Sequence, residues 1–169
     1  MTRSAQRGLT AVEVAIGIAI VGSLTAIAIP ACVGELHASK FAEPVDGLAR
    51  IGKSAVAHAS ASEHVSLSLL AFPQTTPLTP DKAPRGKMEV DPAGTWDHPT
   101  WRALDFRATP DGVPHAFAFQ IDSKPEEMSA QAHGDLDGDG VTSTFEIRCA
   151  RDGSGARVLP GMYLEAEVE

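Results

Sequence analysis

The stretch GLTAVEVAIGIAIVGSLTAIAIP, residues 8–30, decides how the rest of this sequence is interpreted. It is an apolar run whose only charged residue is Glu13, and the short basic leader MTRSAQR precedes it. As a helix, residues 9–29 would span about 31 Å, enough to cross a hydrocarbon core of about 30 Å. The run therefore predicts a membrane-spanning helix. A carboxylate inside such a helix costs about 2.5–3.5 kcal/mol on insertion scales, so Glu13 needs a positively charged partner, for which a free amine is the candidate.

This stretch resembles the class III signal of type IV pilins and pseudopilins, and the family positions that it matches are Gly8, Thr10, Glu13, Gly22 and Pro30. The resemblance implies that a prepilin peptidase cuts between Gly8 and Leu9 and N-methylates Leu9. It also implies that Glu13 and Pro30 belong to the assembly segment, where Glu13 pairs with the Leu9 amine of a neighbouring subunit. The sequence departs from the family at Leu9, usually phenylalanine, and at the smaller residues Ala11, Ala15 and Gly17.

Two other interpretations of the same stretch stay open. An ordinary secretory signal has a basic start, an apolar centre and an A-x-A cleavage site, which residues 26–28 would supply. The length of the run and the charge of Glu13 inside it argue against that interpretation. A plain single-pass anchor would leave Gly8 and Glu13 unexplained.

Length, charge and cysteine positions limit what the remaining chain can be. Its 169 residues fit one domain after the anchor. The net charge is −8, and loss of Arg3 and Arg7 with residues 1–8 makes it more negative. Nucleic-acid binding is not expected, because it needs clustered Lys and Arg. Cys32 follows the apolar run while Cys149 lies in a strand-like segment, so we expect no bridge between them.

Residues 31–62 continue the helical pattern as an amphipathic segment. Apolar residues recur at spacings of three to five, at Val33, Leu36, Phe41, Val45, Leu48, Ile51 and Ala55. Pro30 and Pro44 each remove a backbone donor, so we expect a long helix that bends or locally melts at both. The apolar face is expected to pack on a sheet.

Residues 63–112 are predicted to form a loop region, because repeated prolines and turn-forming residues oppose long helices and central strands. Within it, WDHPTWRALDF (96–106) is expected to form a short turn or helix whose Trp and Phe side chains fill the core. His98 in this segment is expected to face solvent or cap the helix.

Residues 113–169 are predicted to form a small antiparallel sheet of three to four strands. The segments with strand character are 115–122, 129–136, 144–150 and 162–169. Short connections between them indicate a meander. Together with the long helix, this predicts an α+β protein, and the resemblance implies the pilin fold.

The acidic loop GDLDGDGVTSTFE (134–146) carries the only chemical motif. It matches D-x-[DN]-x-[DN]-G-x₅-E, a pattern typical of Ca²⁺-binding loops. The predicted ligands are the carboxylates of Asp135, Asp137, Asp139 and Glu146, the Val141 carbonyl and, through water, Ser143. An acidic hairpin turn is the alternative, because Asp-Gly pairs are common in tight turns.

No nucleophile motif or phosphate-binding glycine loop appears, so an enzyme is not expected. The resemblance implies a structural subunit of a type IV pilus-like filament, held in the inner membrane before assembly and displayed on the surface afterwards. A pseudopilin of type II secretion, in a periplasmic pseudopilus, is an alternative. The other is a soluble periplasmic Ca²⁺-binding module released by ordinary signal cleavage.

Overall fold

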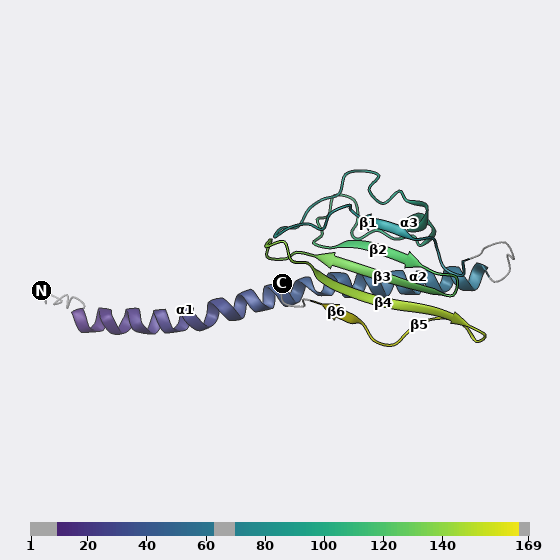
Figure 1. Ribbon diagram of the computed structural model, residues 1–169. Helices are drawn as coiled ribbons and strands as arrows, with labels where there is room; N and C mark the ends of the chain where they lie inside the picture. The colour runs from purple at the N-terminus through teal and green to yellow at the C-terminus, as the bar shows by residue number, and fades with distance from the viewer. Residues whose placement is uncertain (1–9, 63–69, 166–169) are drawn as a thin grey trace, which may run out of the picture. The chain divides into compact units, whose positions relative to one another are not determined.

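The computed structural model describes residues 10–62 and 70–165, with the backbone alone for residues 30–40 and 62 (Figure 1). The chain divides into two compact units, Met1–Ser39 and Lys40–Glu169. The protein is α+β, with an apolar helix near the N-terminus and an antiparallel sheet.

The first unit is dominated by helix α1, Ala11–Lys40, which begins with a reciprocal cap. The Thr10 N–H and hydroxyl donate to Oε2 of Glu13 at 2.8 and 2.9 Å, and the Glu13 N–H donates to the Thr10 hydroxyl at 3.3 Å. This is a capping box, which satisfies backbone donors that a helix start otherwise leaves unpaired. Helix α1 begins at Ala11 for this reason.

The apolar part of α1, Ala11–Ile29, is long and apolar enough to cross a membrane, and none of it is buried. The hydroxyls of Ser23 and Thr25 donate back to helix carbonyls at 2.7 and 3.0 Å, so these two side chains need no water. The helix continues through Pro30, where a local melting was expected, and the helical assignment is interrupted instead at Phe41.

Helix α2, Ala42–Ser62, opens the second unit. Pro44 stands in its first turn, where a missing N–H costs no intrahelical bond. The predicted apolar face is confirmed for Leu48, Ile51 and Ala55, which are fully buried. Val45 was placed on that face but is 44 % exposed. The side chains of Val33 and Leu36 lie outside the described residues.

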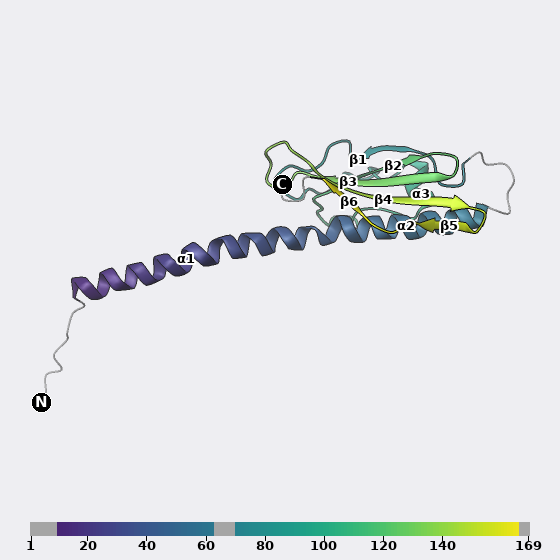
Figure 2. The ribbon, with the colours of Figure 1, turned by 60° about the horizontal axis from the view of Figure 1, so that its bottom comes forward.

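The second unit contains one six-stranded sheet in the order β1-β2-β3-β4-β5, with β6 also paired to β4. The strands are β1 Thr76–Thr79, β2 Ala118–Ser123, β3 Glu127–Gly134, β4 Ser143–Asp152, β5 Gly155–Val158 and β6 Tyr163–Glu165. Every pairing is antiparallel, so the predicted meander is confirmed for β2, β3 and β4. Helix α2 lies along one face of this sheet (Figures 1 and 2).

The expected number of three to four strands is wrong. Strand β1 lies inside residues 63–112, which were predicted to be loop, and it contains Pro77. It stands at the edge of the sheet, where a residue without an N–H is tolerated. Strand β5 follows β4 after a tight turn at 153–154 and lies outside the four segments that were predicted to be strands.

The core lies between α2 and the sheet. Residues at alternate positions of two of the predicted strand segments are all buried: Phe117, Phe119 and Ile121 in 115–122, and Phe145, Ile147 and Cys149 in 144–150. Helix and sheet approach closely because Gly47 has no side chain, and a Cβ at this position would lie 2.7 Å from the Phe119 ring. Cys149 is a free, buried thiol, and burial raises its pKa to about 11.

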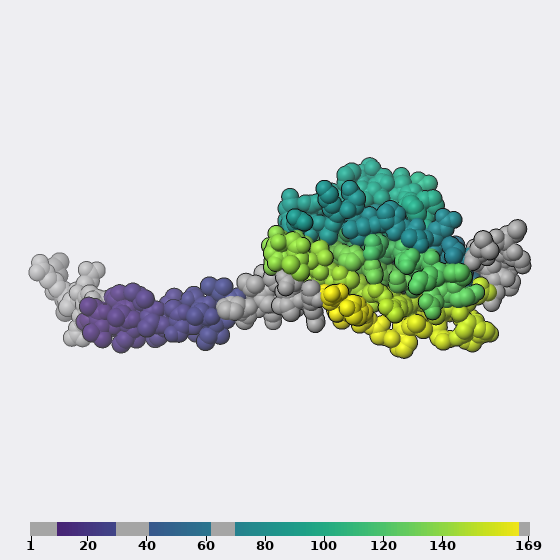
Figure 3. Space-filling view, viewed as in Figure 1, coloured from purple at the N-terminus to yellow at the C-terminus, as the bar shows by residue number. Residues whose placement is uncertain are grey.

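Residues 70–117, which include β1, form the continuous teal layer of the space-filling view (Figure 3). It contains a short helix, α3, Pro99–Ala103, whose Trp101 is fully buried. This confirms the short element predicted at 96–106. His98 caps α3 as expected, accepting a hydrogen bond from the Thr100 N–H at 3.3 Å.

Glu43 joins the start of α2 to the chain just before β2. Its carboxylate accepts hydrogen bonds from the N–H groups of Ala116 and Phe117, each at 3.1 Å. Burial nevertheless raises the pKa of Glu43, outweighing those two bonds and the positive charge of His115, which lower it. The folded protein therefore holds the Glu43 proton more tightly than the unfolded chain does.

This raised pKa predicts a pH dependence of stability. Because the folded state binds the proton better, the Glu43 contribution to the free energy of unfolding is largest below its ordinary pKa of 4.5 and falls as the pH rises through the raised value. Glu43→Gln has no proton to lose. Its free energy of unfolding should therefore rise relative to that of the wild type as the pH increases through the raised pKa of Glu43. Urea unfolding at about pH 4 and about pH 6.5 measures the change. Glu126→Gln, at an exposed site, is the control, and equal behaviour of the two variants would contradict the assignment.

Candidate metal centre

The acidic loop connects β3 to β4 and is closed at its base by the pairing of Gly134 with Ser143. Inside it, each carboxylate binds backbone N–H groups of the same loop. Oδ1 of Asp137 accepts from Asp139 N–H at 3.1 Å, and Oδ1 of Asp139 accepts from Val141 N–H at 2.6 Å. Gly140 has φ of 98°, a conformation that favours glycine and makes the sharp turn.

The side chains of Asp135, Asp137 and Asp139 converge, because alternate residues of a tightly curled loop point to its inside. Their carboxylate oxygens lie within 4.8 Å of one another. Oxygens that bind one Ca²⁺ at about 2.3–2.6 Å can stand at most about 4.6–5.2 Å apart, so this spacing fits a single ion. Carboxylate oxygens are also the ligands that hard cations prefer. The three residues can therefore hold a divalent cation.

Of the three aspartates, Asp135 is the one that is buried and held by the most contacts. Its side chain is 1 % exposed, and its two oxygens accept from the N–H groups of Gly138 and Gly140 at 2.7 and 3.1 Å. The Arg85 guanidinium lies 3.7 Å away, and the Gly86 N–H donates to the Asp135 carbonyl at 2.7 Å. Arg85 and Gly86 come from the loop before α3. Nothing in the spacing of the acidic motif indicates this contact.

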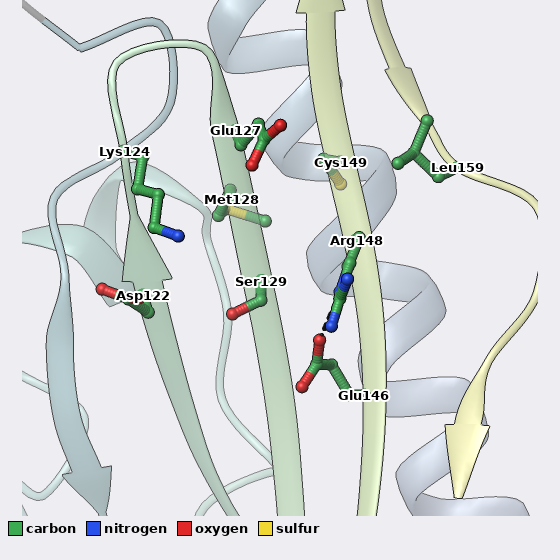
Figure 4. Close-up of a pocket in the computed structure, with 9 residues that line it drawn as sticks. All are labelled: Asp122, Lys124, Glu127, Met128, Ser129, Glu146, Arg148, Cys149 and Leu159. Carbon is green, nitrogen blue, oxygen red and sulfur yellow. Dashed lines mark hydrogen bonds and ion pairs between the residues drawn. The ribbon is translucent and has the colours of Figure 1, made fainter.

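The structure does not bring Glu146 into the carboxylate group. It lies on β4, where one oxygen accepts from Nε of Arg148 at 2.6 Å (Figure 4). The other oxygen accepts from Nε2 of Gln131 at 2.7 Å. Burial acts to raise the pKa of Glu146, but the bonds from Gln131 and Arg148 outweigh it and lower the pKa. Glu146 and Arg148 line a polar pocket of about 320 Å³ on the sheet.

The other predicted ligands lie near the three aspartates in sequence but have different surroundings. Val141 is exposed and its N–H is engaged by Asp139. Ser143 is buried at the start of β4, opposite Gly134. The arrangement thus brings Asp135, Asp137 and Asp139 together and leaves Ser143 and Glu146 in strand β4.

The predicted processing residues, Gly8 and Leu9, lie outside the described residues. Of the predicted assembly residues, Glu13 is engaged in the Thr10 capping box, and Pro30 lies within α1 with its side chain outside the described part. The thiol of Cys32 is likewise outside it.

The chain matches no protein-family model, no curated protein and no solved structure with which it was compared.

Proposed function

We propose that this chain is a type IV pilin-like precursor, a structural subunit with a Ca²⁺-binding loop in its head. The observation that carries the proposal is an exposed apolar helix of membrane-spanning length, preceded by a basic leader, whose single carboxylate lies in its first turn beside Thr10. In an ordinary membrane anchor a carboxylate at this position only makes insertion less favourable. In a subunit whose helix leaves the bilayer to pack against other helices, the same carboxylate can pair with a charged group of a neighbour.

The second unit supports the same proposal. One long α-helix packed on an antiparallel meander is the layout expected of a pilin head. In the proposed assembly, Glu13 exchanges its Thr10 hydrogen bonds for the Leu9 amine of a neighbouring subunit. The partners are thus further subunits, the prepilin peptidase and, before assembly, the inner membrane.

The proposed head binds Ca²⁺ through Asp135, Asp137 and Asp139, with the Val141 carbonyl, a water on Ser143 and Glu146 completing the set. Glu146 reaches the ion only if it releases Arg148 and Gln131. The ion would fix the β3–β4 connection, and with it the Arg85 segment that is bonded to Asp135. The surface of the displayed head would thus depend on Ca²⁺.

Processing tests the proposed function. Expressed with a prepilin peptidase, the chain should be cut between Gly8 and Leu9, because the basic leader stays in the cytoplasm and the apolar helix stays in the bilayer. Mass spectrometry of the mature chain identifies its first residue. Gly8→Leu should leave the precursor uncut. A mature chain that begins at Ile29 would instead identify a soluble module released by ordinary signal cleavage.

A further inference from the structure

A groove with a mostly apolar lining lies between α2 and β5 in the second unit. Strand β5 lies next to α2 (Figure 2). The groove has a volume of about 600 Å³. Its lining comes from α2, β4, β5 and the connection after β5, and includes Val45, Ala49, Val56, Ile147, Val158 and Met162. It shares no residue with the candidate metal centre, so the groove is a separate feature of the second unit.

Helix α2 has two apolar stripes, and the groove accounts for the second one. The first stripe packs on the sheet and is fully buried. The second consists of Val45, Ala49 and Val56, at spacings of four and seven residues, which place them on one side of a helix. Val45 and Ala49 are exposed, and Val56 is half-buried. Val45 is therefore an apolar residue of the groove rather than of the core.

The floor of the groove is closed by direct packing of the helix on the sheet. Gly52 has no side chain, and a Cβ there would lie 2.9 Å from Cδ1 of Ile147 and 3.1 Å from Cγ2 of Val158. Above this floor the groove opens to solvent, since Val158 is 42 % exposed. Apolar surface left in water is stabilised when an apolar group covers it. The groove thus favours a ligand with a hydrocarbon part.

The charges beside the groove favour a ligand that also carries one negative group. Lys53 lines the groove and is exposed, and no carboxylate pairs with it among residues 10–62 and 70–165. The other lining cation, Arg157, is neutralised by Asp152. Most cations of the described surface are likewise paired: Arg50, Arg85, Lys87, Arg102, Arg107 and Arg148. The Lys53 ammonium is therefore available to an anionic group of a ligand.

We infer that this groove binds an unbranched fatty carboxylate, with the hydrocarbon chain along Val45, Ala49 and Val56 and the carboxylate on Lys53. The groove falls within the volume of about 300–1,000 Å³ that is usual for small-molecule sites. Such sites are mostly apolar and contain a few polar groups that fix the orientation of the ligand. A neutral chain would use the apolar lining alone, and a cationic amphiphile would be repelled by Lys53.

Nuclear magnetic resonance on the full chain in phosphatidylcholine nanodiscs, with ¹³C-labelled methionine methyl groups, tests this inference. Met162 lines the groove, Met128 is buried in the core, and Met88 is exposed and does not line the groove. Decanoate, added below its micelle-forming concentration, should shift the Met162 signal until it saturates and leave the other two in place. Equal shifts of Met88 and Met162, or a Met162 shift that does not saturate, would overturn the inference.

Variants separate the contribution of the charge from that of the chain. Lys53→Gln should weaken decanoate binding about fivefold, the effect of losing one exposed ion pair, and leave binding of decanol unchanged. Lys82→Gln, at an exposed lysine that does not line the groove, should bind decanoate like the wild type.

Ala49→Phe places a ring in the groove at an exposed position and should abolish the Met162 response, while an unchanged Met128 signal shows that the core is intact. The inference fails if Lys53→Gln binds decanoate as tightly as Lys82→Gln does. It also fails if decanol binds the wild type as tightly as decanoate, or if Ala49→Phe keeps the response.

Discussion

Trp101→Ala is expected to lower the free energy of unfolding of the second unit by about 3–5 kcal/mol, the usual cost of removing a large buried aromatic side chain. Trp101 is fully buried on α3 and packs against Trp96 and Phe106, with ring centroids 5.5 and 5.4 Å away. Its Nε1 donates to the Thr79 hydroxyl at 2.9 Å, which ties α3 to the edge strand β1. The substitution therefore opens a cavity and breaks a buried hydrogen bond together.

Urea unfolding of a fragment that begins at residue 35, followed by far-ultraviolet circular dichroism, measures this loss. Trp101→Phe keeps most of the ring and should cost less, with about 1 kcal/mol of it from the bond to Thr79. Met88→Ala, at a side chain that is 47 % exposed, is the surface control and should stay within about 0.5 kcal/mol of wild type. If Trp101→Ala matched this control, the segment before β2 would not be part of the cooperative core.

Periodicity explains which parts of this fold could be predicted from the sequence. The spacing of Leu48, Ile51 and Ala55 repeats over several turns, and the alternation of Phe145 with Ile147 repeats along one strand. A repeated pattern of this kind still predicts the helix or strand when a single residue does not fit it. Strand β1 has four residues, one of them Pro77, and owes its conformation to pairing with β2, some 40 residues later. No local pattern predicts a strand that is formed by its partner.

In the candidate site, too, some residues could be placed from their sequence spacing and others could not. The carboxylates of Asp135, Asp137 and Asp139 converge because these residues lie at alternate positions of one short loop. Their spacing in the sequence was therefore enough to predict that they lie close together. Glu146 lies on β4 between two inward-facing residues, Phe145 and Ile147, so the two-residue period of the strand turns it to the other face. Contacts such as Glu43 with Ala116 and Arg85 with Asp135 join distant segments, and sequence spacing has no information about them.

Ca²⁺ is expected to raise the melting temperature of the fragment on the order of 10 °C at a free concentration of about 100 times its dissociation constant. Binding to the folded state alone stabilises it by about 2.7 kcal/mol at that excess. The physical reason is the close approach of the Asp135, Asp137 and Asp139 carboxylates, which repel one another until a cation lies between them. Mg²⁺ should act weakly, because it demands a smaller, octahedral site.

The three carboxylates have different surroundings, so they differ in how much the loop depends on them without an ion. Asp135 is buried and accepts two backbone N–H groups, so its removal would disturb the loop with or without an ion. Asp139 is exposed and, among residues 10–62 and 70–165, accepts a hydrogen bond only from Val141. Asp139→Ala should therefore keep the melting temperature in chelator and lose the response to Ca²⁺. Asp81→Ala, at another exposed aspartate, should keep both. Equal melting temperatures of the unmutated fragment in Ca²⁺ and in chelator would identify residues 134–146 as an acidic turn, in which backbone N–H groups alone hold the carboxylates together.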